Sequence, residues 1–127
     1  MPLYHVWFAT KGRRWLLRGE VGETAKQLMW SVARERNIGL LECASMVDHV
    51  HLLIAAADRA QLSKAMNLLK GTSSRRLFQQ FPDLKQDAAV KNFWQHRYGA
   101  KVVPEGAETQ VRHYIRTQWD RPKKYER

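Results

Sequence analysis

The sequence predicts an α+β fold: a ferredoxin-like (RRM-like) antiparallel sheet with helices on one face and an appended C-terminal helix. Strand-like and helix-like segments follow one another in the order β-α-β-β-α-β-α. The chain has 127 residues, enough for one core but not for two, so residues 1–127 are expected to form one domain. It contains no internal repeat, low-complexity stretch or linker that would divide it.

Four segments have the composition of strands, because β-branched and aromatic residues are gathered between turn-forming residues. They are residues 3–10, 40–47, 48–54 and 93–103. The second and third follow each other closely enough to form an antiparallel hairpin. Gly99 predicts a bulge or bend inside the fourth.

Three segments show apolar residues at helical spacing. The first covers about 20–36, the second runs from its N-cap Asp58 to Phe81, and the third covers about 107–119, before a basic tail. Gly71-Thr72-Ser73-Ser74 interrupts the apolar stripe of the second helix, which predicts a kink or the close approach of another backbone. Residues 83–92 are expected to be a polar loop.

The net charge is the strongest global feature. Lys and Arg number 22 against 12 acidic residues, which gives a net charge of +10 and a pI near 10.2. So basic a short chain indicates a polyanionic partner, and nucleic acid is the usual one. Basic residues at six positions are candidates for phosphate contacts, although such residues can also form a solvated surface: Lys11, Arg13, Arg14, Lys70, Arg75 and Arg76.

Cys43 is the only cysteine, so the sequence predicts neither a disulfide framework nor a cysteine-based zinc site. No apolar run approaches the roughly 20 residues of a membrane-spanning helix. The first residues lack the basic and apolar regions of a signal peptide, so a cytoplasmic location is expected.

The strand at 48–54 carries the clearest candidate for a metal site. Side chains alternate along a strand, so His49 and His51 face one way and Val50 and Leu52 the other. Two imidazoles roughly 6–7 Å apart on one face can converge on a single cation. The alternative is that the pair simply lines a half-buried sheet. Asp48 is either a turn former or an outer partner that holds a histidine ring or a metal-bound water.

The last helix offers the missing parts of such a site. Tyr114 and Gln118 are four residues apart and therefore lie on one side of the helix. A Gln amide oxygen is a neutral oxygen ligand that can complete a site begun by two imidazoles. A Tyr hydroxyl is a nucleophile that can carry a covalent intermediate. From the spacing alone, Tyr114 can equally be a rim residue and Gln118 a surface residue.

Several motifs together resemble the single-tyrosine transposases of the HUH class, the short insertion-sequence enzymes and their repeat-associated relatives. The matching runs occur in the family's order over nearly the whole chain: Tyr4-His5-Val6-Trp7, Thr10-Lys11-Gly12-Arg13-Arg14, Val47-Asp48-His49-Val50-His51-Leu52-Leu53, Leu69-Lys70-Gly71-Thr72-Ser73-Ser74-Arg75, Phe93-Trp94-Gln95 with Tyr98, and Tyr114-Ile115-Arg116-Thr117-Gln118. The combination of a His-hydrophobic-His strand with a downstream Tyr-x-x-x-Gln helix is specific.

The resemblance implies a role for each of four residues. His49 and His51 are expected to hold Mg²⁺ or Mn²⁺ with Gln118 as third ligand, and Tyr114 is expected to form a 5′-phosphotyrosine link while a 3′-OH is released. The implied substrates are single-stranded DNA ends folded into hairpins. The implied assembly is a homodimer in which the tyrosine helix of one subunit serves the histidine pair of the other.

Two other functions remain open at this point. One is a non-catalytic nucleic-acid-binding module with a ferredoxin-like sheet, which would present aromatic residues on its central strands. The other is a domesticated relative that binds or nicks hairpins without moving DNA. A protein–DNA adduct that requires Tyr114 distinguishes the enzyme from the binding module.

Overall fold

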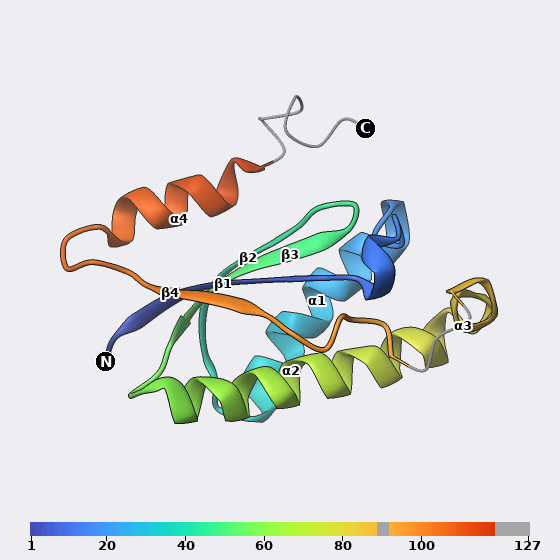
Figure 1. Cartoon of the computed structure of the whole chain (residues 1–127), viewed down its shortest axis with the longest axis horizontal. Helices are drawn as coiled ribbons and strands as arrows, with labels where there is room; N and C mark the ends of the chain where they lie inside the picture. Colours follow the sequence, from blue (N-terminus) through green and yellow to red (C-terminus); the bar gives the residue numbers. More distant parts are fainter. Residues whose placement is uncertain (89–91, 119–127) are drawn as a thin grey trace.

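The computed structural model describes residues 1–88 and 92–118 of the chain. Four strands in this part form one antiparallel sheet in the order β2-β3-β1-β4 (Figure 1). They are β1 (Leu3–Ala9), β2 (Gly39–Ser45), β3 (His49–Ala55) and β4 (Gly99–Val102). This is the order of two interleaved β-α-β units, so the predicted ferredoxin-like sheet is confirmed.

Helices cover both faces of the sheet. The long helices α1 (Gly19–Glu35) and α2 (Arg59–Gln80) pack on one face, and α4 (Glu108–Arg116) lies over β2 and β3 on the other (Figure 1). The larger core lies beneath α1 and α2, and β3 contributes Val50, Leu52 and Ile54 to it. A smaller core beneath α4 contains Leu53 and Ile115. Strand β3 therefore supplies alternate residues to two cores, as the period of two requires.

The polar stretch in α2 marks a docking point and not a kink. The helix continues without a break from Arg59 to Gln80. The Ser74 hydroxyl accepts a hydrogen bond from the Phe93 backbone N–H at 2.9 Å, and the Ser73 hydroxyl accepts one from the Trp94 indole at 2.8 Å. The close approach predicted at this stretch is thus made by segment 93–94.

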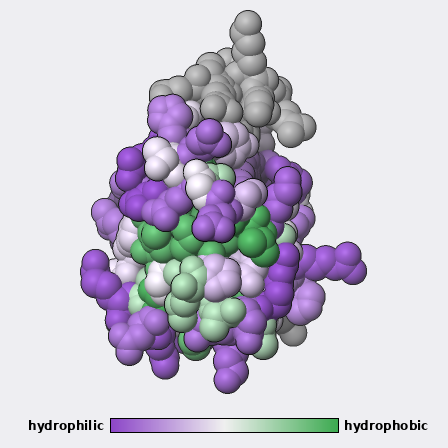
Figure 2. Space-filling view, turned by 90° about the vertical axis from the view of Figure 1, so that its left-hand side faces the viewer, coloured by the Kyte–Doolittle hydropathy of each residue, from purple (hydrophilic) through white to green (hydrophobic). Residues whose placement is uncertain are grey.

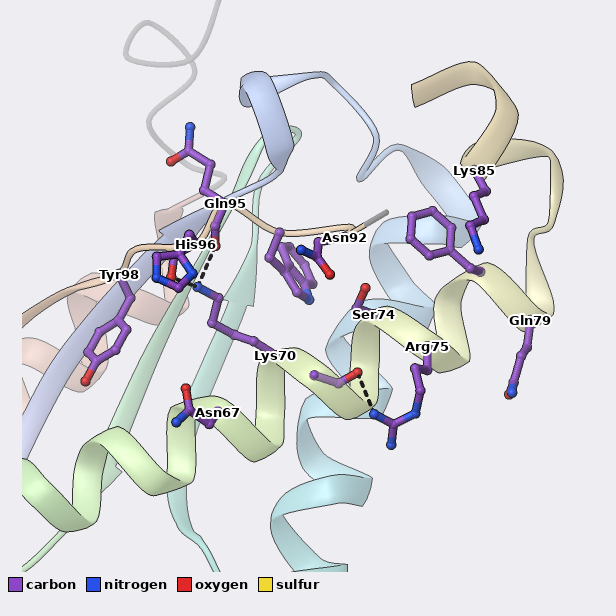
Figure 3. A pocket seen from close by; sticks show the side chains of 13 residues that line it. Asn67, Lys70, Ser74, Arg75, Gln79, Lys85, Asn92, Gln95, His96 and Tyr98 are labelled. Carbon is purple, nitrogen blue, oxygen red and sulfur yellow. Dashed lines mark hydrogen bonds between the residues drawn. The ribbon is translucent and has the colours of Figure 1, made fainter. Parts of the chain in front are cut away.

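The fourth strand is shorter than predicted. The Lys70 ammonium donates to the carbonyls of Gln95, His96 and Arg97 at 2.6, 3.0 and 3.2 Å, and Figure 3 shows this side chain reaching from α2 to the segment. Before it, Trp94 makes an isolated antiparallel bridge with Thr10, and the regular pairing of β4 with β1 begins only at Gly99. The predicted strand is therefore interrupted: Trp94 pairs with Thr10, but residues 95–98 form no strand.

One further segment differs from expectation. Residues 83–88, expected as a polar loop, form the short helix α3 (Asp83–Ala88), whose first turn carries an acidic residue at the favourable helix end. The residues after β1 form a 3₁₀ turn, η1 (Lys11–Arg13). Helix α4 ends at Arg116, and the predicted continuation to Trp119 and the basic tail lie outside the described residues.

The surface is mostly hydrophilic on the side that carries the N-terminus and the β4–α4 connection, with a hydrophobic band across it at the level of the sheet (Figure 2). No helix within residues 1–88 and 92–118 has the length and apolar character needed to cross a membrane.

Candidate active site

Strand β3 presents His49 and His51 on the face that α4 partly covers. Their ring centroids are 4.9 Å apart. In the antiparallel pairing of β1 with β3, Trp7 lies opposite His51 and Ala9 lies opposite His49. The two histidines therefore project from the same face of the sheet. His51 is buried and His49 is half-buried.

The His49 ring is held from one side by Asp48. Its Nδ1 lies 2.7 Å from Oδ1 of Asp48, whose other carboxylate oxygen lies 3.3 Å from the Arg13 guanidinium. The Asp48 carbonyl accepts a hydrogen bond from the Thr10 backbone N–H at 2.9 Å, which fixes the turn before β3. The carboxylate fixes the His49 ring with Nε2 as the nitrogen that could bind a metal.

The His51 ring is held by a third histidine, His5, which lies in one of the matching motifs but for which the sequence predicted no role. Nε2 of His5 lies 2.9 Å from Nδ1 of His51, and the two rings stack with centroids 5.2 Å apart. Burial, followed by the charge of Lys101, lowers the pKa of His5. His5 therefore faces His51 as a neutral ring that can accept a hydrogen bond from its Nδ1.

The remaining nitrogen of His51 fits a metal ligand. Within the described residues, its Nε2 is buried and has no hydrogen-bond partner. Burial, and then the charges of His49 and His5, lower the pKa of His51 to about 3, so the ring is neutral at physiological pH. A neutral, oriented imidazole nitrogen is a good ligand for a divalent ion.

A third protein ligand has to come from another residue type. In residues 1–88 and 92–118, no group of three or more His, Cys, Asp or Glu side chains is placed to hold a metal ion. Gln118 is fully buried, and its amide nitrogen donates to the Tyr114 carbonyl at 2.9 Å. With that nitrogen bonded to the helix, the amide oxygen is the atom that could act as a ligand.

Tyr114 is placed close to the histidines of its own chain. Its ring centroid lies 6.0 Å from that of His51 and 5.8 Å from that of His5, and both pairs meet edge to face. The three rings border a hollow of about 480 Å³, lined also by Trp7, Lys101, Gln110 and Val111. The structure thus brings together a phenol and an imidazole nitrogen that has no hydrogen-bond partner among the described residues, and both rings line a space that a substrate can enter.

Helix α4 is fastened to β2 by ion pairs. One Glu42 oxygen lies 2.9 Å from Arg112 and 2.6 Å from Arg116. Burial alone would raise the pKa of Glu42, but hydrogen bonds and charge from the two arginines outweigh it and leave the pKa below its usual value. Glu42 is therefore charged at neutral pH and holds the helix that carries Tyr114.

The basic residues expected to contact DNA fall into two groups. Lys11, Arg13 and Arg14 are exposed in and beside the turn η1, which follows β1 near the histidine pair. The other three lie on α2. Arg76 makes a two-pronged ion pair with Glu35 at 2.8 and 2.9 Å.

Lys70 and Arg75 line a separate hollow of about 610 Å³ between α2 and segment 92–98 (Figure 3). The Lys70 ammonium is bonded to backbone carbonyls there, and burial lowers its pKa to about 8. Arg75 donates to the Gly71 carbonyl at 3.4 Å. Both side chains therefore have structural contacts, whatever else they bind.

The family model described as "Transposase IS200 like" matches residues 2–118 of the chain. The chain belongs to the IS200-like transposase family. It is 32% identical over 118 residues to the ISDra2 transposase TnpA of Deinococcus radiodurans, and this alignment covers 93% of this chain and 84% of the relative. It is 31% identical over 120 residues to the transposase for insertion sequence element IS200 of Salmonella typhimurium, covering 94% and 78% respectively.

Solved structures agree with this membership. The chain superposes on a crystal structure of a Deinococcus radiodurans protein assigned as a transposase with a TM-score of 0.74 and 34% identity, over 93% of this chain and 92% of the other. A REP-associated tyrosine transposase bound to a REP hairpin shares the fold, with a TM-score of 0.64 and 14% identity, over 98% and 68%. An IS200-like transposase is an enzyme that cuts DNA and transfers strands, and the candidate site can be considered in that light.

Proposed function

We propose that this IS200-like transposase cuts and rejoins hairpin-bearing ends of single-stranded DNA through a 5′-phosphotyrosine at Tyr114, moving a short insertion element. The single observation that carries the proposal is the placement of the Tyr114 ring 6.0 Å from that of His51, whose buried Nε2 has no partner within the described residues. The hollow that both residues line is open to solvent and, at about 480 Å³, large enough for part of a nucleotide.

In the cleavage step Tyr114 is the nucleophile. Its phenolic oxygen forms a bond to the scissile phosphorus and the bond from phosphorus to the 3′ oxygen breaks, while the phenolic proton passes to water and the 3′ oxygen takes a proton from water. The products are a 5′-phosphotyrosine and a 3′-OH. Because the phosphotyrosine keeps the energy of the phosphodiester, a second 3′-OH can attack it and rejoin the strands without ATP.

The chain's own residues prepare this step. A phenol with a pKa of about 10 is a weak nucleophile at neutral pH, so the phosphate has to be made more reactive. His49, His51 and Gln118 would hold Mg²⁺ or Mn²⁺, which when bound neutralises charge on the non-bridging phosphate oxygens. Asp48 orients His49 through the 2.7 Å contact, and Arg13, beside it, adds positive charge where the phosphate would lie.

The net charge of +10 supports a single strand of DNA as substrate, since a basic surface attracts phosphates. We propose that Lys11, Arg13 and Arg14, in and beside the turn η1, contact the strand that is cut; Arg13 lines a hollow together with His49 and His51. The three basic residues on α2 lie in the helical layer on the sheet face opposite α4, and two of them, Lys70 and Arg75, line the hollow between α2 and segment 92–98 (Figure 1).

A homodimer in which α4 of one subunit serves the histidine pair of the other is the second arrangement that we propose to test. The single chain already brings Tyr114 to its own His51, so the shared arrangement is an alternative to this one and needs its own test. Mixing Tyr114→Phe protein with His51→Ala protein provides it. Activity returns in the mixture only if a tyrosine from one subunit works with histidines from another.

The proposed chemistry is tested by incubating the protein with single strands that carry hairpins, with and without Mn²⁺, and looking for a covalent adduct on a denaturing gel. Wild type should form an adduct that Tyr114→Phe abolishes. Tyr4→Phe is a matched control, because Tyr4 belongs to the larger core beneath α1 and α2 and does not line the hollow that Tyr114 borders. Tight DNA binding with no adduct under any divalent metal would leave a non-catalytic binding module.

A further inference from the structure

A second hollow adjoins the histidine pair on the side away from Tyr114. It has a volume of about 420 Å³, in the size range of small-molecule sites. Its lining includes His49 and His51 together with Trp7, Arg13, Arg97 and Tyr98. His51 and Trp7 also line the hollow that Tyr114 borders, so these two residues form the ridge between the two spaces.

Trp7 stands on this ridge as an exposed aromatic surface. It pairs with His51 across β1 and β3, and 38% of its surface is exposed, which is unusual for a tryptophan on a central strand. On the other side it pairs with Gly99 of β4. A Cβ added at Gly99 would lie 2.2 Å from Cε2 of the indole, so the ring rests over the glycine where no side chain could fit.

The charge around the second hollow suits a nucleotide. Arg13 and Arg97 are exposed at its border, and 53% of the Arg13 side chain is accessible. No acidic residue lines this hollow among the described residues. An exposed aromatic ring bordered by arginines is the arrangement that stacks an unpaired base while its phosphates are bound.

We infer that the Trp7 hollow binds the unpaired base of the nucleotide that carries the released 3′-OH, stacked on the indole. This inference rests on the proposed cleavage at Tyr114. In phosphoryl transfer the attacking and leaving oxygens lie roughly in line on opposite sides of the phosphorus. Tyr114 borders the first hollow, so the leaving 3′ oxygen and its nucleotide point into the second.

In this inference Trp7 contributes to the affinity for the DNA strand by stacking on a base, and not by contacting a phosphate. Stacking on one aromatic side chain changes affinity by about 5- to 100-fold per base. Trp7→Leu should weaken binding of a fluorescein-labelled (dT)₁₂ strand by this factor, whereas Trp7→Phe should retain most of the affinity. Gly99→Ala should reproduce the loss seen in Trp7→Leu, because the new methyl group displaces the indole.

Trp15 provides a matched control, since it is 39% exposed and lines neither hollow. Trp15→Leu should leave the affinity for (dT)₁₂ within twofold of wild type. Measuring all variants in a Tyr114→Phe background excludes any contribution from cleavage. Equal losses in Trp7→Leu and Trp15→Leu would overturn the inference, as would an unchanged affinity in Trp7→Leu.

A second experiment tests which nucleotide of the strand occupies the Trp7 hollow. It uses a DNA strand that forms the Tyr114 adduct and places a single abasic residue, in turn, at each nucleotide on either side of the cut. Loss of the base next to the 3′-OH should weaken binding to the Trp7-containing protein but not to Trp7→Leu. If the largest loss instead falls on the nucleotide that stays with Tyr114, the assignment of the hollow is wrong. If no strand forms an adduct, the proposed cleavage fails, and the (dT)₁₂ comparison alone decides whether Trp7 stacks bases.

Discussion

Replacing His5 tests whether the two-histidine contact prepares the metal site. The 2.9 Å contact from His5 Nε2 to His51 Nδ1 is the only hydrogen bond to the His51 ring among the described residues, since its Nε2 has no partner there. His5→Leu removes the acceptor and leaves His51 Nδ1–H buried without a partner. His5→Gln can keep an amide oxygen near the position of the lost Nε2 and so keeps the acceptor.

The expected size follows from what such partners contribute elsewhere. Removing the residue that orients a metal-bound histidine typically lowers metal affinity about 10- to 100-fold, or about 1.4–2.7 kcal/mol. We expect Mn²⁺ affinity, measured by titration calorimetry, to fall by such a factor in His5→Leu and by clearly less in His5→Gln. The adduct yield should then be partly restored in His5→Leu by raising the Mn²⁺ concentration.

His113→Gln is the matched control, because His113 is an exposed histidine on α4 one residue from Tyr114. It should leave Mn²⁺ affinity unchanged. If His5→Leu binds Mn²⁺ as tightly as wild type, His5 does not position His51. Equal losses in His5→Leu and His5→Gln would mean that ring packing, not the hydrogen bond, is responsible.

Three further residues, Glu42, Lys70 and Cys43, give testable predictions. Glu42→Gln should lower the free energy of local unfolding of α4 by about 2 kcal/mol, seen as faster amide hydrogen exchange in that helix, and should reduce the Tyr114 adduct, because α4 loses its ion pairs to β2. The main transition in urea melts should change little. The folded-state pKa of Glu42 lies below the usual value. The stabilisation that the Glu42 carboxylate provides is therefore present above about pH 4.3 and is lost as the pH falls through the lowered pKa. Glu42→Gln should not show this loss. Lys70→Met should cost about 2 kcal/mol of stability in the same melts and loosen segment 95–97, seen as faster amide hydrogen exchange there, because three carbonyls lose a charged donor. Burial raises the pKa of the Cys43 thiol to about 12, so a colorimetric thiol reagent should not label the native protein and should label it after unfolding; rapid native labelling would contradict this.

The parts of the site that sequence could predict are those set by local periodicity. Alternation along β3 places His49 and His51 on one face, and the helical repeat places Tyr114 and Gln118 one turn apart. Neither inference needs a distant residue. The fold class follows in the same way, from the order of segments and the turn residues between them.

What sequence could not predict depends on register and on distant pairs. His5 contacts His51 only because β1 pairs with β3 in one register, with Trp7 opposite His51, and a shift by one residue would turn His5 to the other face. Arg112 and Glu42 are 70 residues apart in the chain, and nothing local connects them. Alternation of His5 and Trp7 on a strand was the one signal that could have drawn attention to this face.

The two halves of the site are attached to the fold in different ways, and this difference has a consequence for mutagenesis. The histidine pair belongs to β3, a central strand whose alternate side chains enter both cores, so perturbing this strand should unfold the protein before it alters the site alone. Tyr114 belongs to a nine-residue helix held by the small core around Ile115 and by the ion pairs of Glu42. Substitutions that weaken this attachment should therefore reduce adduct formation while DNA binding and the main unfolding transition change little. If Ile115→Ala instead lowers adduct formation, DNA binding and the stability of the main unfolding transition together, α4 is an integral part of the cooperative core.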